Sequence, residues 1–177
     1  MCATLTLVLG GASSGKSNIA EKLCFHSALD RVYLASAQCF DDEMRTKVDR
    51  HRTERGTDWT TIEEPFDAAR VIRAAQPDQI VLFDCATLWL TNHLLAGHDL
   101  AAQTRTLLAA LRDTPARVVI VSNEVGQGIV PDNALSRRFR IAQGTLNRQL
   151  ADTAGTVIGV MAGLPFMLKG PRPEALG

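Results

Sequence analysis

Residues Gly10 to Ser17 read GGASSGKS, which matches the phosphate-binding pattern G-x-x-x-x-G-K-[ST]. Its glycines let the backbone turn sharply, so that N–H groups can approach anionic oxygens. Lys16 is a cation suited to the terminal phosphates, and the Ser17 hydroxyl is a potential Mg²⁺ ligand. A chance Gly/Ser-rich turn is the alternative, but a strand-like run precedes the motif and a helical pattern follows it. We therefore predict that a nucleoside triphosphate binds to Gly10, Gly11, Ala12, Ser13, Ser14, Gly15, Lys16 and Ser17.

Carboxylates follow two other apolar runs. Asp84 ends IVLFD, where a parallel strand would emerge at the ligand-binding edge of the sheet. We favour Mg²⁺ binding by Asp84 together with Ser17, the alternative being that Asp84 only caps the next helix. Glu124 follows another run, and the roles of base, metal-shell ligand and plain loop carboxylate remain open for it.

A charged segment lies between the second predicted strand and Trp59. It contains three arginines around one histidine: Arg50, His51, Arg52 and Arg55. Most charge runs are solvated helix faces. Here, however, the segment follows a parallel strand directly, and arginines grip phosphates bidentately. A neutral imidazole can attack a phosphorus atom to form a phosphoramidate, but from chemistry alone an ordinary surface histidine is the favoured interpretation of His51.

The elements that must position these residues follow a βαβ rhythm. Short β-branched runs alternate with segments of helical period, which predicts an α/β fold with a mostly parallel sheet and helices on both faces. We predict strands at Thr4–Leu9, Arg31–Ala35, Gln79–Asp84, Arg117–Ser122 and Thr156–Met161, with weaker candidates at Trp59–Glu63 and in the tail. We predict helices at Lys16–Ser27, Asp41–Arg55, Pro65–Ala75, Leu88–Leu95, Leu100–Asp113 and Asn133–Ala154. In the last helix, an inward stripe is predicted from Leu135, Phe139, Ala142, Leu146, Leu150 and Ala154.

Composition narrows the class of protein. The 19 basic and 19 acidic residues balance, which disfavours a dedicated nucleic-acid binder or an acidic-membrane binder. Apolar runs are too short to span a bilayer, no signal peptide is recognised, and the four cysteines lack metal-ligand spacing. We therefore expect one cytoplasmic domain over residues 1–177, with reduced thiols and a mobile Pro/Gly-rich end.

Several segments together resemble one family. GGASSGKS, YLASAQ, DDEM, the His51-Arg52 pair, VLFDCATLWLTN and SNEVGQGIVPDNALSRRFR occur in an order and at a spacing similar to those of the bifunctional adenosylcobinamide kinase/adenosylcobinamide-phosphate guanylyltransferases of cobalamin biosynthesis. The phosphate loop is generic, whereas DDEM with the following His-Arg pair and NEVGxGIVPxN are far more specific. The resemblance covers about Leu5 to Pro165.

The resemblance implies a P-loop NTPase-type fold with a RecA-like sheet, a homotrimer, and use of ATP, GTP and Mg²⁺ with a corrinoid substrate. It implies phosphorylation of adenosylcobinamide, then GMP transfer from GTP through a guanylylated histidine, which gives adenosylcobinamide-GDP. The matching histidine is His51, and Lys16 is the loop cation. Further nucleotide contacts implied by the resemblance are Ala35, Ser36, Ala37, Arg52, Thr53, Glu54, Arg55, Glu63 and Asp84.

The sequence departs from the family pattern at two positions. Ile141 stands where an aspartate usually follows RxFR, and Arg148 replaces the glutamine of an Asn-Gln pair. Two other functions are compatible with the phosphate loop. One is a P-loop kinase acting on another small molecule, without covalent guanylylation. The other is a nucleotide-dependent switch or assembly ATPase, which predicts slow hydrolysis without an acceptor.

Overall fold

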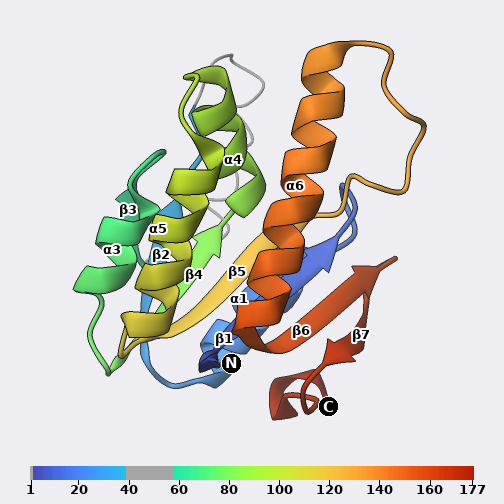
Figure 1. Cartoon of the computed structure of the whole chain (residues 1–177). Coiled ribbons are helices and arrows are strands. Elements are labelled where there is room, and N and C mark those ends of the chain that lie inside the picture. Colours follow the sequence, from blue (N-terminus) through green and yellow to red (C-terminus); the bar gives the residue numbers. More distant parts are fainter. Residues whose placement is uncertain (1, 39–57) are drawn as a thin grey trace.

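The computed structural model of the protein describes residues 2–38 and 58–177. Its strands form one sheet in the order β3-β2-β4-β5-β1-β6-β7 (Figure 1). Neighbouring strands are parallel except β6 and β7, which form an antiparallel hairpin at one edge. The strands are β1 (Cys2–Gly10), β2 (Asp30–Ala35), β3 (Thr60–Glu63), β4 (Gln79–Asp84), β5 (Arg117–Asn123), β6 (Ala154–Met161) and β7 (Leu164–Lys169).

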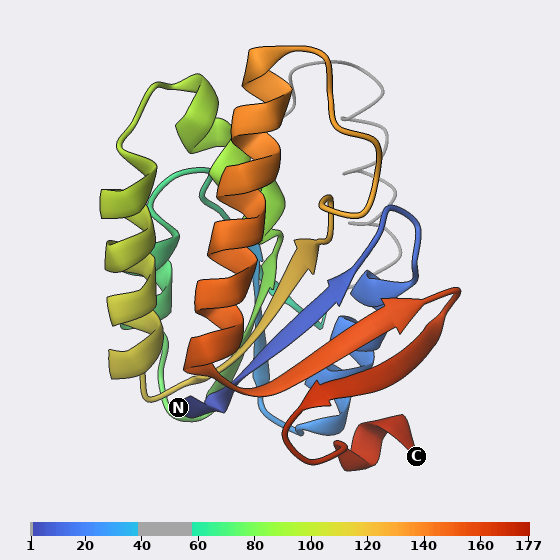
Figure 2. The same cartoon turned by 45° about the vertical axis from the view of Figure 1, so that its right-hand side comes forward.

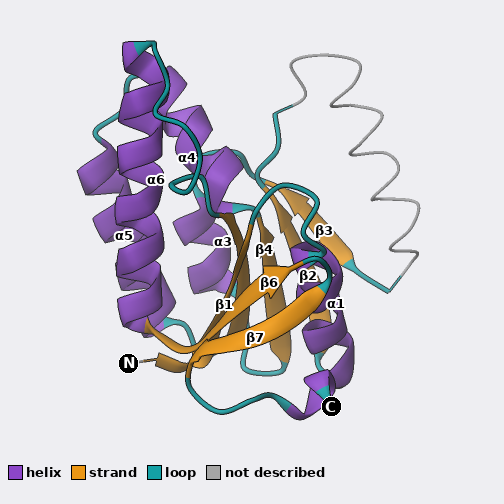
Figure 3. Ribbon diagram, turned by 90° about the vertical axis from the view of Figure 1, so that its right-hand side faces the viewer, coloured by secondary structure: helices purple, strands orange, loops and turns teal. Residues whose placement is uncertain are grey.

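Helices cover both faces of this sheet. One face carries α3 (Ala68–Ala74), α4 (Ala86–Leu95), α5 (Leu100–Asp113) and α6 (Ala134–Thr153). The other face carries α1 (Lys16–His26) and a short 3₁₀ helix, η1 (Glu174–Leu176), as Figures 2 and 3 show. The predicted α/β class is confirmed, with a mostly parallel sheet between two helical layers.

Side chains along each strand point alternately to the two faces of the sheet, so the hydrophobic core has two parts. In β1, Leu7 is buried beneath the four-helix face, whereas Val8 is buried on the α1 face. Successive strand residues point to opposite faces, so a central strand covered on both sides must be apolar at nearly every position. The run QIVLFD of β4 meets this demand, since its four central residues are all buried.

Most predicted elements are present with small shifts at their ends. The weaker strand candidates are confirmed as β3 and β7, while α3 begins three residues later than predicted. It does so because the Asp67 side chain accepts a hydrogen bond from Arg70 N and caps the helix at that point. The predicted helix at 41–55 lies outside the described residues.

Two expectations are wrong. Leu135 is 52% exposed because the first turns of α6 extend beyond the sheet, whereas Leu146, Leu150 and Ala154 lie in the core (Figure 1). The chain end was expected to be mobile, but η1 packs against α1 and buries Ala175 and Leu176.

The described part of the chain also bears on two expectations drawn from composition. Within it, no helix is long and apolar enough to cross a membrane. Of the cysteines, Cys24 and Cys85 are buried free thiols.

Candidate nucleotide-binding site

The loop between β1 and α1 curls through two residues in the left-handed region. Ser13 has a φ of 55° and Gly15, the N-cap of α1, has a φ of 89°. The first N–H groups of a helix lack intrahelical partners and attract anions. The Lys16 ammonium lies across the loop, where it donates to the Gly11 carbonyl oxygen at 3.0 Å. Backbone donors and a cation are thus gathered within one turn of chain.

Close packing inside the loop explains its first glycine. A Cβ atom on Gly10 would overlap Ser14 Oγ and would lie 2.7 Å from the carbonyl oxygen of Val160. Ser14 Oγ is buried and has no hydrogen-bond partner among the described residues. Buried polar groups are nearly always hydrogen-bonded, so an unpartnered hydroxyl inside this loop is unusual.

Strand register brings the other predicted residues to the same edge of the sheet. Ala35, at the end of β2, is paired with Glu63 of β3 on one side and with Asp84 of β4 on the other. Gly10, at the end of β1, is paired with Asn123 at the end of β5. All of these are carboxyl ends of parallel strands, the edge at which open α/β sheets bind ligands.

Asp84 is held at this edge by a side-chain contact. Its Oδ2 accepts a hydrogen bond of 3.0 Å from the Tyr33 hydroxyl. The N-cap of α4 is Cys85, so the alternative that Asp84 caps this helix is wrong. Burial raises the pKa of the Cys85 thiol to about 11, helped by the charge of Asp84 and opposed by that of Lys16. Cys85 itself therefore stays a neutral thiol.

Of the predicted nucleotide contacts Ala35, Ser36 and Ala37 at the end of β2, only some have side chains free to contact a ligand. The Ser36 hydroxyl is fully buried, donating to the Cys85 carbonyl at 2.8 Å and accepting from Cys85 N at 3.0 Å. The Asn92 amide of α4 donates to the Ser36 carbonyl at 2.8 Å. Ser36 therefore braces β2 against α4, and its hydroxyl is not aimed at a nucleotide. Ala35 and Ala37 are partly exposed and remain predicted contacts.

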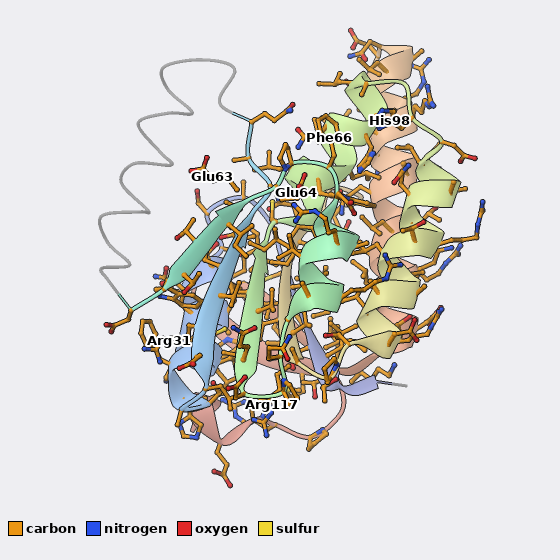
Figure 4. All side chains as sticks on the ribbon, turned by 90° about the vertical axis from the view of Figure 1, so that its left-hand side faces the viewer. Arg31, Glu63, Glu64, Phe66, His98 and Arg117 are labelled. Atoms are coloured by element: carbon orange, nitrogen blue, oxygen red, sulfur yellow. The ribbon has the colours of Figure 1, made fainter. Side chains whose placement is uncertain are left out.

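Two successive glutamates lie at the end of β3, Glu63 as its last residue and Glu64 just after it, and their roles differ. Figure 4 places Glu63 and Glu64 at the end of the sheet opposite Arg117. The Glu64 carboxylate accepts from Asp67 N and pairs with Arg70 at 2.7 Å, and these contacts, the first above all, lower its pKa. Glu64 is thus committed to the start of α3. The Glu63 side chain is exposed at the site edge and remains a predicted nucleotide contact.

The predicted histidine and its neighbours lie outside the described residues. These are His51, Arg52, Thr53, Glu54 and Arg55. The described chain leaves β2 at the ligand edge and resumes before β3 at the opposite edge, because the two strands are parallel.

A buried polar network supports the loop that follows β5. Ser122 Oγ donates to Asn147 Oδ1 at 2.6 Å, and Gln143 Nε2 donates to both groups at 2.9 Å. Asn147 Nδ2 also donates to the Asn123 carbonyl at 2.9 Å. Next in the chain, Glu124 N donates to the Gly10 carbonyl at 3.0 Å. The network thus fixes Glu124 beside the phosphate loop, while the chemical role of its carboxylate stays open.

A histidine pair anchors the segment between β3 and α3. His93 is 2% exposed, and its Nε2 lies 3.1 Å from the Phe66 carbonyl, so this nitrogen carries the proton and donates. Its Nδ1 then accepts from His98 Nδ1, 2.8 Å away. Burial lowers the pKa of His93, and the neighbouring His98 lowers it further. Figure 4 shows His98 and Phe66 together at the end of α4.

This arrangement predicts a loss of stability in acid. Because the folded-state pKa of His93 is below its unfolded value of about 6.5, the unfolded chain binds the proton more readily. The unfolding free energy is therefore expected to fall as pH decreases from about 6.5 toward the folded-state pKa. Urea denaturation between pH 7.5 and 5 should show a shallower decline for His93→Gln than for the unmodified protein. The exposed His26 gives the control, and an unchanged slope in His93→Gln would contradict the prediction.

Comparison with known proteins shows which family this chain is similar to. The sequence model of a family described as cobinamide kinase / cobinamide phosphate guanyltransferase matches residues 6–168. The chain belongs to this family. Bifunctional adenosylcobalamin biosynthesis protein CobP of Pseudomonas aeruginosa is 43% identical over 167 residues, which cover 93% of this chain and 96% of that protein. CobU of Escherichia coli is 38% identical over 181 residues, which cover 93% of this chain and 99% of that protein. A solved structure from Pyrococcus horikoshii OT3 shares the fold, with a TM-score of 0.56 and 10% identity over 100% of this chain and 92% of that one.

Membership of the cobinamide kinase/guanyltransferase family agrees with the resemblance drawn from the motifs. The two departures from its pattern lie on α6. Ile141 is 71% exposed and Arg148 is also exposed, whereas the neighbouring Asn147 is buried. Neither departure therefore disturbs the network that holds the loop after β5.

Sequence reasoning missed several residues that build the site. Tyr33 reads as an ordinary strand residue, yet its hydroxyl orients Asp84. Asn92 and His93 interrupt the apolar helix LWLTNHLL, and this was the available signal that α4 holds polar partners. Gly163, in the β6–β7 turn, donates its N–H to the Ser14 carbonyl at 2.9 Å. No local pattern connects it with a loop almost 150 residues earlier.

Proposed function

We propose that this chain phosphorylates adenosylcobinamide and then transfers GMP from GTP to adenosylcobinamide phosphate through a guanylylated histidine. The product is adenosylcobinamide-GDP, an intermediate of cobalamin biosynthesis made in the cytoplasm by one domain over residues 1–177. The observation that carries the proposal is the Lys16 ammonium lying across a phosphate loop at the edge of the sheet where Asp84 ends β4. Family membership supplies the identity of the acceptor.

In the first reaction, the loop at residues 10–17 binds the phosphates of ATP or GTP. The aminopropanol hydroxyl of adenosylcobinamide attacks the γ-phosphorus, a new P–O bond forms, and the nucleoside diphosphate leaves. Transfer of a phosphoryl group demands positioning and stabilisation of charge rather than covalent help from the protein. The loop N–H groups position the phosphates, and Lys16 offsets the negative charge on the phosphate oxygens.

Mg²⁺ fits the donor set of this site. The Ser17 hydroxyl and the Asp84 carboxylate are hard oxygen ligands of the kind that Mg²⁺ prefers, and Asp84 is already oriented by Tyr33. We propose that these two residues hold the ion directly or through its water shell. When bound, Mg²⁺ neutralises charge on the phosphates of the nucleotide.

In the second reaction, the neutral imidazole of His51 attacks the α-phosphorus of GTP. An N–P bond forms and pyrophosphate leaves, with Lys16 offsetting the charge of the departing group. A phosphate oxygen of adenosylcobinamide phosphate then attacks the same phosphorus atom, which breaks the N–P bond and frees His51. We assign contacts to the guanine nucleotide to Arg52, Thr53, Glu54, Arg55 and Glu63 by resemblance to the family.

We also propose a homotrimer, which the resemblance implies. Large apolar side chains are exposed around the start of α6 and the loop before it, where Ile129 is 97% and Val130 66% exposed. Exposed apolar clusters of this kind mark protein contacts more often than solvent faces. Light scattering on the purified protein measures the mass directly, and a monomer would exclude the trimer.

The direct test of the function supplies adenosylcobinamide, ATP, GTP and Mg²⁺ to the purified protein and identifies the corrinoid products by mass. The proposal expects the phosphate first and the GDP adduct afterwards, together with pyrophosphate. A kinase for another small molecule would leave adenosylcobinamide unmodified. A switch or assembly ATPase would hydrolyse the nucleotide at a rate independent of the corrinoid.

A further inference from the structure

A cavity of about 550 Å³ adjoins the phosphate loop, within the size range typical of small-molecule sites. One wall is the loop itself, from Gly10 to Ser14. The facing wall is the β6–β7 hairpin, with the apolar side chains of Met161, Phe166 and Leu168. A single hollow thus joins a surface built for phosphate to a surface that is apolar and aromatic.

The Phe166 ring is fixed while part of it stays open. Phe166 is paired with Gly159 across the hairpin, and its ring lies over this glycine, because a Cβ atom added there would overlap the outer ring carbons. The residue is nevertheless 44% exposed. An aromatic ring held against backbone, with exposed area facing a cavity, can stack with a flat partner at little cost in conformational entropy.

The hairpin and the phosphate loop are held together as one unit. Gly163 N donates to the Ser14 carbonyl at 2.9 Å, and a Cβ atom on Gly15 would lie 3.2 Å from Gly163 Cα. The relative positions of the loop and the aromatic wall are therefore set by backbone contacts before any ligand arrives.

We propose that the purine base of the phosphate donor stacks on Phe166, flanked by Met161 and Leu168, when its phosphates occupy the loop. This inference rests on the nucleotide-binding role proposed for the loop. A nucleotide is the ligand that matches the cavity, because it joins an anionic chain to a flat aromatic group. In a nucleotide the phosphates lie at one end and the base at the other. In the cavity the phosphate loop likewise lies on one side and the apolar wall on the other.

Equilibrium binding of two probes tests the stacking contact separately from the phosphate contacts. The probes are the non-hydrolysable ATP analogue AMP-PNP and inorganic tripolyphosphate, which has no base. Replacing Phe166 with leucine keeps apolar bulk but removes the π-face. We expect Phe166→Leu to bind AMP-PNP roughly 5- to 100-fold more weakly, in line with the cost of losing one stacked base. Its affinity for tripolyphosphate should be unchanged.

Matched variants complete the design. Phe166→Tyr keeps an aromatic face and should bind AMP-PNP like the unmodified protein. Leu164→Ala changes an exposed residue on the same face of β7 that does not line the cavity, and should also bind normally. Thermal unfolding of each variant reports whether the hairpin remains folded. The loss in Phe166→Leu should be similar for the guanine analogue GMP-PNP, since every base offers a face for stacking.

The outcomes separate this inference from the function on which it rests. Unchanged AMP-PNP affinity in Phe166→Leu would overturn the stacking contact, as would equal affinities of the unmodified protein for AMP-PNP and tripolyphosphate. A change confined to the KM for adenosylcobinamide would mean that the corrinoid, and not the base, occupies the hairpin. If tripolyphosphate fails to bind while Phe166→Leu still weakens AMP-PNP, the phosphate loop assignment fails and the stacking contact stands.

Discussion

Replacing Lys16 with alanine is expected to lower phosphorylation of adenosylcobinamide at least about a hundredfold, the cost typical of removing one charge-stabilising group from a transition state. Lys16 is the cation that lies across the phosphate loop, where its ammonium donates to the Gly11 carbonyl. Its loss leaves the backbone N–H groups to bind the phosphates, so the rate of transfer should fall more than nucleotide affinity. Transfer of labelled γ-phosphate from ATP to adenosylcobinamide measures the effect.

The same helix offers a control for this substitution. Lys22 is exposed on α1 and does not belong to the loop, so Lys22→Ala removes the same charge from the same element. It should phosphorylate adenosylcobinamide like the unmodified protein. Full activity in Lys16→Ala would remove the loop from the kinase reaction, and equal losses in both variants would point to the overall charge of α1 instead.

The fold could be predicted wherever local signals agree with one another. The strand Gln79–Asp84 and the helix Leu100–Asp113 have the predicted bounds. In the helix, Asp99 caps the first turn by accepting from Ala101 N and Ala102 N, and Thr114-Pro115 ends the periodic pattern. The capping residue, the hydrophobic period and the proline that ends the helix all act within a few residues of the chain. The sequence alone is therefore sufficient to place such elements.

Burial at the ends of elements could not be predicted in this way. The helical period puts Leu135 on the same stripe as Leu146, but only the second lies over the sheet, because α6 is longer than the strands it covers. The tail residue Leu176 looks like part of a loose Pro/Gly-rich end, yet it fills the core under α1. In both cases, burial of the side chain depends on where a neighbouring element ends in space. The helical period and the local composition carry no information about that position.

In the candidate site, too, local features could be predicted and contacts between distant residues could not. The positions of the phosphate loop and of Asp84 at one edge of the sheet could be predicted, because a motif and a strand end are local features. The orientation of Ser36 could not, because its hydroxyl binds the backbone of Cys85, 49 residues away. The cavity beside Phe166 could not be predicted either, since a phenylalanine in an edge strand is usually ordinary packing.

Replacing His51 with alanine is expected to abolish covalent guanylylation entirely. The proposed intermediate is an N–P bond on this imidazole, and alanine has no nucleophile to form it. Incubation with α-labelled GTP and no corrinoid should leave label on the unmodified protein, stable in alkali and lost in acid, as a phosphoramidate requires. The same incubation of His51→Ala should leave none, and GMP transfer to adenosylcobinamide phosphate should disappear with it.

The histidines that lie in the described residues sharpen this test. His93 and His98 are bound to one another at the end of α4, and His26 lies at the far end of α1, so none of them is expected to take the label. His98→Ala, which keeps His51, should therefore be labelled as strongly as the unmodified protein. Phosphorylation of adenosylcobinamide should survive in His51→Ala, because that reaction needs the loop and not the imidazole. Label that persists in His51→Ala would place the covalent step on another residue and leave the kinase reaction untouched.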